Sequence, residues 1–277
     1  MKESEIKALI SLLDDEDEEV YQMVEDKILS FGDEIIPFLE SEWESNLDPL
    51  VQNRIEELIH TVQFFELKQR LIDWKNAEEQ NLLEGAWILC TYLYPDLTLE
   101  ELETQIEQLR YECWLYLKDD MDEVEQVRAI NYVLFNKYHL TANTKNFHSP
   151  MNSMVNYVME SKKGNPISLS IIYLLIANKL DMPVYGVNLP NLFVVSYKDE
   201  DNQFYINPFN KGLIFSRADI ENYIEQLRLE PKDIFFEPCE NIDIIKRSLR
   251  NLMVSYEKLG DMEKVDEIKE LADVLAS

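Results

Sequence analysis

The segment from Pro166 to Leu180 constrains the fold most, because its side chains are apolar on nearly every side. Asn165 precedes it as an expected N-cap, and Pro166 stands at the first helical position, which proline favours. A helix that is apolar all round is stable only when other protein surrounds it. We therefore predict a central helix buried in a core.

A period of two replaces the helical period after Pro183. Apolar and β-branched residues then alternate in short segments, and Asp199 to Asn202 has the composition of a hairpin turn. The predicted strands are Val184 to Val187, Phe193 to Tyr197, Phe204 to Ile206 and Leu213 to Phe215. A small antiparallel sheet packed on a central helix is an α+β domain, in a chain that is otherwise mostly helical.

Helical spacing dominates the first 75 residues, where one pattern recurs after 31 positions. The matching residues are Asp17, Val20, Val24 and Ile28 in the first copy and Asp48, Val51, Ile55 and Ile59 in the second. Repeated helix pairs of this kind are similar to HEAT repeats. The acidic run Asp14 to Asp17 lacks the glycine and terminal glutamate of a calcium-binding loop, so we interpret it as a solvated helix start.

Two further helical regions complete the chain. Residues 80–137 predict three helices, one of which opens with the capping box Thr98 and Glu101 and one of which ends near Tyr138. From Ile242 onward the spacing, with Gly260 at its turn, is similar to a tetratricopeptide hairpin. The predicted domains are 1–75 (HEAT-like), 76–240 (the α+β domain) and 241–277 (tetratricopeptide-like).

The charge balance restricts the partners. There are 26 Lys and Arg against 54 Asp and Glu, a net charge of −28, and the basic clusters are as short as Lys162-Lys163 and Lys246-Arg247. Such a field repels nucleic acids and anionic membranes and favours a basic protein or peptide. The longest apolar run, Ile171 to Ala177, is too short to span a membrane, and the polar start Met1 to Glu5 does not resemble a signal peptide, so we expect a cytoplasmic protein.

Few residues are available for metal binding or nucleophilic chemistry. The three cysteines are far apart and form no zinc-binding pattern, so we expect neither a metal nor a cofactor. Cys90 and Cys113 lie in apolar helical contexts and are predicted to be buried. The thiolate of Cys239 is predicted to be disfavoured by the charge of Glu240 beside it.

Three motifs resemble one known family. They are Leu134 to Asn143 with Ser149-Pro150-Met151-Asn152-Ser153, then Gly164-Asn165-Pro166-Ile167-Ser168, and finally Leu189-Pro190-Asn191-Leu192-Phe193 with Ile206-Asn207-Pro208-Phe209. Their order resembles the SirB-type transglutaminase-like family over residues 80–277. The resemblance places Asn143, Asn152, Gly164, Pro190, Phe193 and Pro208 near a cleft.

The resemblance also implies where a papain-like triad would lie. A cysteine at the start of the central helix would be activated by the helix N-terminus and by a histidine, which an aspartate would orient. Here the nucleophile position is Pro166, or Ser168 if the alignment slips by two residues. The histidine position is Leu192 and the aspartate position is Asn207. These replacements predict that the triad is not catalytic.

The three histidines of the chain are poor substitutes for the missing triad histidine. His148 precedes the central helix and could pair with Ser168, although a loop histidine is more often solvated. His139 is expected to end a helix, where a cation meets the negative end of the helix dipole. His60 lies in the HEAT-like region.

Three functions remain open from the sequence. The preferred one is a non-catalytic scaffold that binds another protein, and the others are a cysteine or serine hydrolase or acyl-transfer enzyme, and a small-molecule site with Leu192 as its apolar wall and Asn207 as its amide. Four tryptophans are candidate anchors of a partner, but their apolar helical surroundings predict core packing for each. They are Trp43, Trp74, Trp87 and Trp114.

Overall fold

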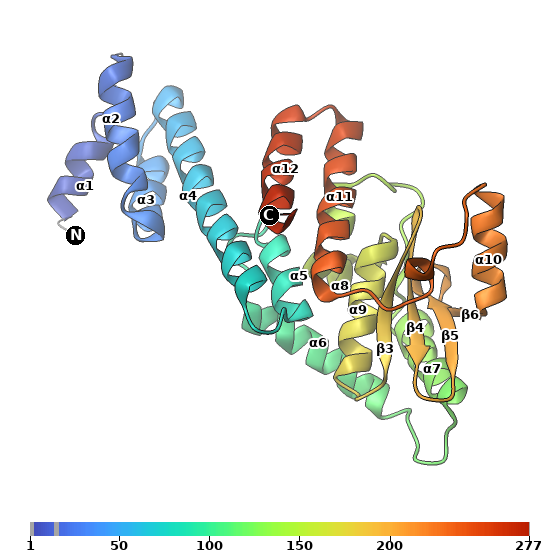
Figure 1. Cartoon of the computed structure of the whole chain (residues 1–277). Helices are drawn as coiled ribbons and strands as arrows, with labels where there is room; N and C mark the ends of the chain where they lie inside the picture. Colours follow the sequence, from blue (N-terminus) through green and yellow to red (C-terminus); the bar gives the residue numbers. More distant parts are fainter. Residues whose placement is uncertain (1–2, 14–16, 277) are drawn as a thin grey trace. The chain divides into compact units, whose positions relative to one another are not determined.

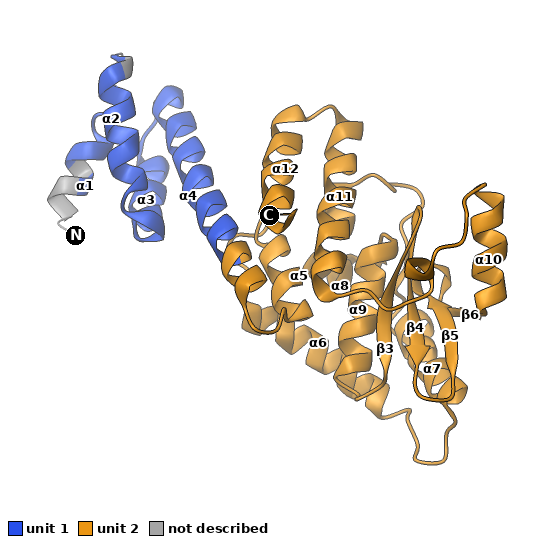
Figure 2. Ribbon diagram, viewed as in Figure 1, with its two compact units in different colours: residues 1–70 blue, residues 71–277 orange. Residues whose placement is uncertain are grey.

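The computed structural model describes residues 3–13 and 17–276, and the chain divides into two compact units, 1–70 and 71–277 (Figure 2). The acidic residues Asp14 to Glu16, for which the sequence predicts a helix start, lie outside the described residues. The division into three domains stays a prediction.

The first unit is helical. Its elements are α1 (Glu3–Ile10), α2 (Glu18–Leu29), the 3₁₀ helix η1 (Gly32–Ile35), α3 (Ile36–Ser45) and α4 (Pro49–Asn76), whose last residues belong to the second unit. Asp17 caps α2 by accepting a hydrogen bond from the Glu19 backbone N–H. Apolar side chains such as Leu13, Ile28 and Ile55 form a core of its own within this unit.

The second unit combines helices with a small antiparallel sheet, so the predicted α+β class is confirmed (Figure 1). Its helices are α5 (Leu82–Cys90), α6 (Leu99–Trp114), α7 (Glu123–Asn131), η2 (Tyr132–Lys137), η3 (Pro150–Ser153), α8 (Val155–Ser161), α9 (Pro166–Asn178), η4 (Pro208–Asn210), α10 (Arg217–Gln226), η5 (Asp233–Phe235), α11 (Asn241–Leu259) and α12 (Met262–Ala276). Its strands are β1 (Thr141–Ala142), β2 (Lys163–Gly164), β3 (Val184–Leu189), β4 (Leu192–Lys198), β5 (Gln203–Asn207) and β6 (Leu213–Phe215).

The four strands β3 to β6 pair in chain order, each antiparallel to the next. Val187 pairs with Val194 and Val195 with Ile206, and this register gives the sheet two distinct faces. One face carries Val187, Val194 and Tyr205 and packs against side chains of α10, while the opposite face meets α9 (Figure 1).

The helix α9 is buried as predicted, and every residue from Ile167 to Ala177 is shielded from solvent. The Asn165 side chain accepts hydrogen bonds from the backbone N–H groups of Ile167 and Ser168, and the Ser168 hydroxyl accepts one from the Asn165 N–H. This capping box satisfies donors that would otherwise be orphaned in the core. A methyl group on Gly164 would come within 2.7 Å of the Ser168 Oγ, so glycine keeps the space that the cap needs.

Several predictions about helices differ from the structure. The helix predicted to end near Tyr138 is α7 followed by the π-helix η2. Core packing is confirmed for Trp74, but it is wrong for Trp43 and Trp114, whose side chains are exposed. These two lie near helix ends, where apolar neighbours in the sequence do not become neighbours in space. Trp87 is half-buried.

None of the helices in the described part of the chain is long and apolar enough to cross a membrane.

We expect Tyr173→Phe to stabilise the second unit by about 1 kcal/mol. Tyr173 is fully buried beneath Phe135, and its hydroxyl has no hydrogen-bond partner among the described residues. The matched change Tyr205→Phe should destabilise by a similar amount, because that hydroxyl donates to the Phe236 carbonyl at 3.1 Å. Urea unfolding of both variants measures the change in the free energy of unfolding. A destabilised Tyr173→Phe variant would contradict the absence of a hydrogen-bond partner for the Tyr173 hydroxyl.

Candidate functional site

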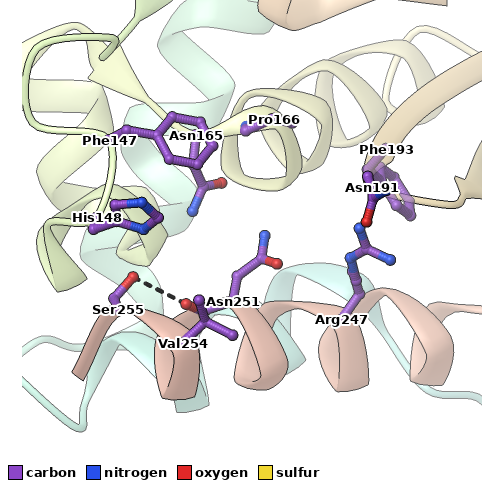
Figure 3. A pocket seen from close by; sticks show the side chains of 10 residues that line it. All are labelled: Phe147, His148, Asn165, Pro166, Asn191, Phe193, Arg247, Asn251, Val254 and Ser255. Carbon is purple, nitrogen blue, oxygen red and sulfur yellow. Dashed lines mark hydrogen bonds between the residues drawn. The ribbon is translucent and has the colours of Figure 1, made fainter. Parts of the chain in front are cut away.

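A cavity of about 200 Å³ lies at the N-terminal end of α9 (Figure 3). Four segments of the second unit meet there: the loop before η3, the start of α9, the β3–β4 turn and one side of α11. The side chains that line it are Phe147, His148, Asn165, Pro166, Asn191, Phe193, Arg247, Asn251, Val254 and Ser255.

The start of α9 has no nucleophile that faces this cavity. Pro166 lines it with a ring of carbon atoms, whereas Ser168 is fully buried and does not line it. The Ser168 hydroxyl is held within the cap, accepting from the Asn165 N–H at 3.0 Å and donating to the Asn165 carbonyl at 3.3 Å. The serine at the shifted nucleophile position is therefore a capping residue.

The β3–β4 turn presents Asn191 and Phe193 to the cavity rather than Leu192. Successive side chains of a strand point to opposite faces, so Leu192 lies on the other face, with the cluster that α10 covers. The apolar wall that the sequence assigned to Leu192 is formed by Phe193. Gly186 allows this, because a Cβ there would lie 2.8 Å from the Phe193 ring.

Asn207 does not line the cavity either. Its side-chain oxygen accepts a hydrogen bond from the Asn210 N–H and caps the short helix η4, in which Pro208 is buried. Pro190 fixes the β3–β4 turn, since its carbonyl accepts from the Tyr223 hydroxyl at 2.9 Å. Asn191 follows with φ of 58°, a conformation that asparagine tolerates better than most residues.

The asparagines of the first motif shape the loop that carries His148. Asn143 donates from its amide to the Asn152 Oδ1 at 2.8 Å, and Asn152 donates to the carbonyls of Asn146 and Phe147. Asn152 is almost fully buried, so these bonds fix the loop from within. They bring His148 to the cavity, but Ser168, the partner that the sequence left open for it, does not reach the same space.

The other two histidines lie away from the cavity. His139 is exposed, with φ of 64°, just beyond the end of η2, and His60 lies in α4 within the first unit.

The three thiols are free and none lines the cavity. Burial raises the pKa of Cys90 to about 11 and that of Cys113 to about 12. Burial, with a smaller contribution from Asp243, raises the pKa of Cys239 to about 12. The sequence ascribed the unfavourable Cys239 thiolate to neighbouring charge, whereas desolvation is the larger cause.

Sequence reasoning missed the α11 wall of the cavity. Arg247 and Asn251 stand one helical turn apart on α11 and face the start of α9 (Figure 3). The basic pair Lys246-Arg247 was the available signal, but only the fold brings it next to residues more than 50 positions earlier in the chain.

Within residues 3–13 and 17–276 no group of three or more His, Cys, Asp or Glu side chains could hold a metal ion.

Comparisons with known proteins identify a family and several relatives. A family model described as the transglutaminase-like superfamily matches residues 100–250, more than half of the chain. A UPF0162 protein of Xylella fastidiosa (strain 9a5c) is 30% identical over 188 residues, which are 63% of this chain and 64% of the relative. A UPF0162 protein of Vibrio cholerae is 26% identical over 151 residues, 54% of this chain and 56% of the relative.

A more distant relative is F-box only protein 21 of Homo sapiens, 23% identical over 222 residues, which are 69% of this chain and 34% of that protein. The chain thus spans less than two thirds of the length of each of these three relatives. No solved structure matches it.

Proposed function

This chain belongs to the transglutaminase-like superfamily, and we propose that it is a non-catalytic member that works by binding a basic protein. The start of α9 is the observation on which the proposal rests. Pro166 occupies the first turn, and the hydroxyls nearest to it are engaged within the structure: Ser168 is held by the helix cap, and Ser170 donates to the Pro166 carbonyl. Without a nucleophile at that position, the acyl-transfer chemistry of a papain-like triad has no starting point.

An exposed aromatic surface supports the binding role. Tyr111, Trp114, Leu115 and Tyr132 are each at least half exposed, on the C-terminal part of α6 and the start of η2. We call this group the α6 aromatic surface. The Tyr111 and Trp114 rings stack with centroids 5.9 Å apart. Tryptophan and tyrosine dominate the binding energy of protein interfaces, and a π-helix is frequent at functional sites.

The charge around this surface selects the partner. The segment 99–137 contains ten Asp and Glu against four Lys and Arg, in a chain whose net charge is −28. A partner with a basic rim around an apolar centre would complement it, and the attraction would weaken as salt increases.

We also propose the finer assignments of the family and of the two helical regions. The SirB-type grouping rests on the order of the three motifs, the HEAT-like one on the repeat in α2 and α4, and the tetratricopeptide-like one on the antiparallel pair α11 and α12. Three free cysteines are typical of a reducing compartment, which supports the cytoplasm as the proposed location.

We expect Trp114→Ala to weaken binding of the partner by about 30-fold or more, as for a central interface residue. A partner captured with the native chain would be purified, and its affinity measured by calorimetry at two salt concentrations. Trp43→Ala is the matched control, because Trp43 is also exposed but lies in the first unit. Equal affinity for the native chain and the Trp114→Ala variant, or a partner of net negative charge, would contradict the proposal.

A further inference from the structure

The cavity at the start of α9 contains the positive charge of Arg247, which forms no ion pair with a carboxylate among the described residues. Arg247 is half-buried on α11, and no Asp or Glu forms an ion pair with it in the described residues. Its one hydrogen bond there goes from Nη1 to the Asn188 Oδ1 at 3.2 Å. Carboxylates outnumber basic residues two to one in this chain, so an unpaired, half-buried arginine is unexpected.

Most donors of this guanidinium are therefore unused. An arginine has five N–H donors and stays protonated at any ordinary pH. The Nε–H of Arg247 is shielded from solvent and has no partner among the described residues. A buried donor without a partner is costly, and a bound acceptor would remove that cost.

Neutral amides complete the lining beside Arg247. Figure 3 shows the amide of Asn251 extending from α11 toward the start of α9, and Asn191 standing next to the guanidinium. Neither amide has a side-chain hydrogen bond to another described residue. The residues that line the cavity include no Asp or Glu, and the rings of Phe147 and Phe193 form its apolar walls.

We infer that this cavity binds a carboxylate group, held in a two-point contact by the Arg247 guanidinium and by the amide N–H donors of Asn251 and Asn191. The planar fork of arginine matches the two oxygens of a carboxylate. Arg247 is the one Lys or Arg among the residues that line the cavity, and a single cation suits a monoanion better than a phosphate dianion. A volume of about 200 Å³ fits one acidic side chain or a small organic acid, because drug-sized ligands occupy about 300 Å³ or more.

Titration of the full chain with defined probes tests the inference. The probes are glutarate, its uncharged diamide, inorganic phosphate, and a blocked short peptide with one Glu or with Gln in its place. We expect saturable binding of glutarate or of the Glu peptide, seen as a shift of the Arg247 Nε–H resonance, and no shift with the diamide or the Gln peptide. Tighter binding of glutarate identifies a free organic acid as the source, and tighter binding of the Glu peptide identifies an acidic side chain of a protein.

Variants of two arginines on α11 distinguish binding in the cavity from a general effect of charge. Arg247→Gln should weaken binding by about 10- to 100-fold and Arg247→Lys by about tenfold, since lysine keeps the charge and loses the fork. Arg250→Gln is the matched control, because Arg250 is exposed on the same helix and the charge change is identical. The affinity of the Arg250→Gln variant for the carboxylate probes should stay within about twofold of the native value.

Three results would overturn the inference. The first is the absence of saturable binding of either carboxylate at millimolar concentrations by the folded native chain. The second is an equal loss of affinity in Arg247→Gln and Arg250→Gln. The third is tighter binding of phosphate than of both carboxylate probes. Circular dichroism of each variant shows that it is folded, and Arg247→Lys remains informative if Arg247→Gln is not.

Discussion

Trp74→Ala is expected to lower the free energy of unfolding of the second unit by about 3–5 kcal/mol, the range for deleting a large buried aromatic side chain. Trp74 is 2% exposed, and its Nε1–H donates to the Asn81 carbonyl at 2.8 Å. Its ring fills the space beside Gly85, where even a Cβ would come within 2.8 Å of it. Truncation would leave a cavity and remove one of the two hydrogen bonds to the Asn81 carbonyl, which would still accept from the Gly85 N–H at the start of α5.

Two further variants make this prediction specific. Trp114→Ala removes the same side chain from an exposed position, so its effect should stay within about 0.5 kcal/mol. Trp74→Phe keeps an aromatic ring and loses the hydrogen bond, so its loss of unfolding free energy should lie between those of Trp74→Ala and Trp114→Ala. Guanidinium unfolding, followed by circular dichroism, measures all three. Equal losses for Trp74→Ala and Trp114→Ala would contradict the burial that we describe.

Local pattern was sufficient to predict the elements of the central fold. The apolar run after Gly164 could only be a buried helix, and the signals of Asn165 and Pro166 gave its first residue correctly. The alternation after Pro183 gave all four strands of the sheet, with β6 at its observed limits. These features depend on neighbours in sequence, which is why one chain sufficed to find them.

The walls of the cavity could not be predicted in the same way. Whether Leu192 or Phe193 faces α9 depends on which face of the sheet α9 covers, and a shift of one residue exchanges the two. Arg247 reaches the cavity only because α11 returns to pack near α9. The exposure of Trp114 also depends on tertiary packing, since apolar residues on both sides of it, Cys113 and Leu115, led the sequence to predict burial.

The three native thiols are expected to react with an alkylating agent about 300 to 3,000 times more slowly at neutral pH than an unperturbed thiol of pKa about 8.5, in proportion to their smaller thiolate fractions. The thiolate is the reactive form, and burial raises the pKa of Cys90 to about 11 and those of Cys113 and Cys239 to about 12. A raised thiol pKa means that the thiolate appears only as the pH rises toward these values. Each rate should therefore increase about tenfold per pH unit across the neutral range, without a plateau.

Alkylation kinetics of the three cysteines across this range, with parallel labelling by a serine-reactive phosphonate, test the central claim most directly. Pro166→Cys is the positive control, because a thiol at a helix N-terminus has a lowered pKa and should react faster than the native three. If the site is not catalytic, the native thiols react slowly with no plateau and no serine is labelled. A thiol that reaches a plateau near neutral pH, or rapid labelling of Ser168, would show an activated nucleophile and contradict the account.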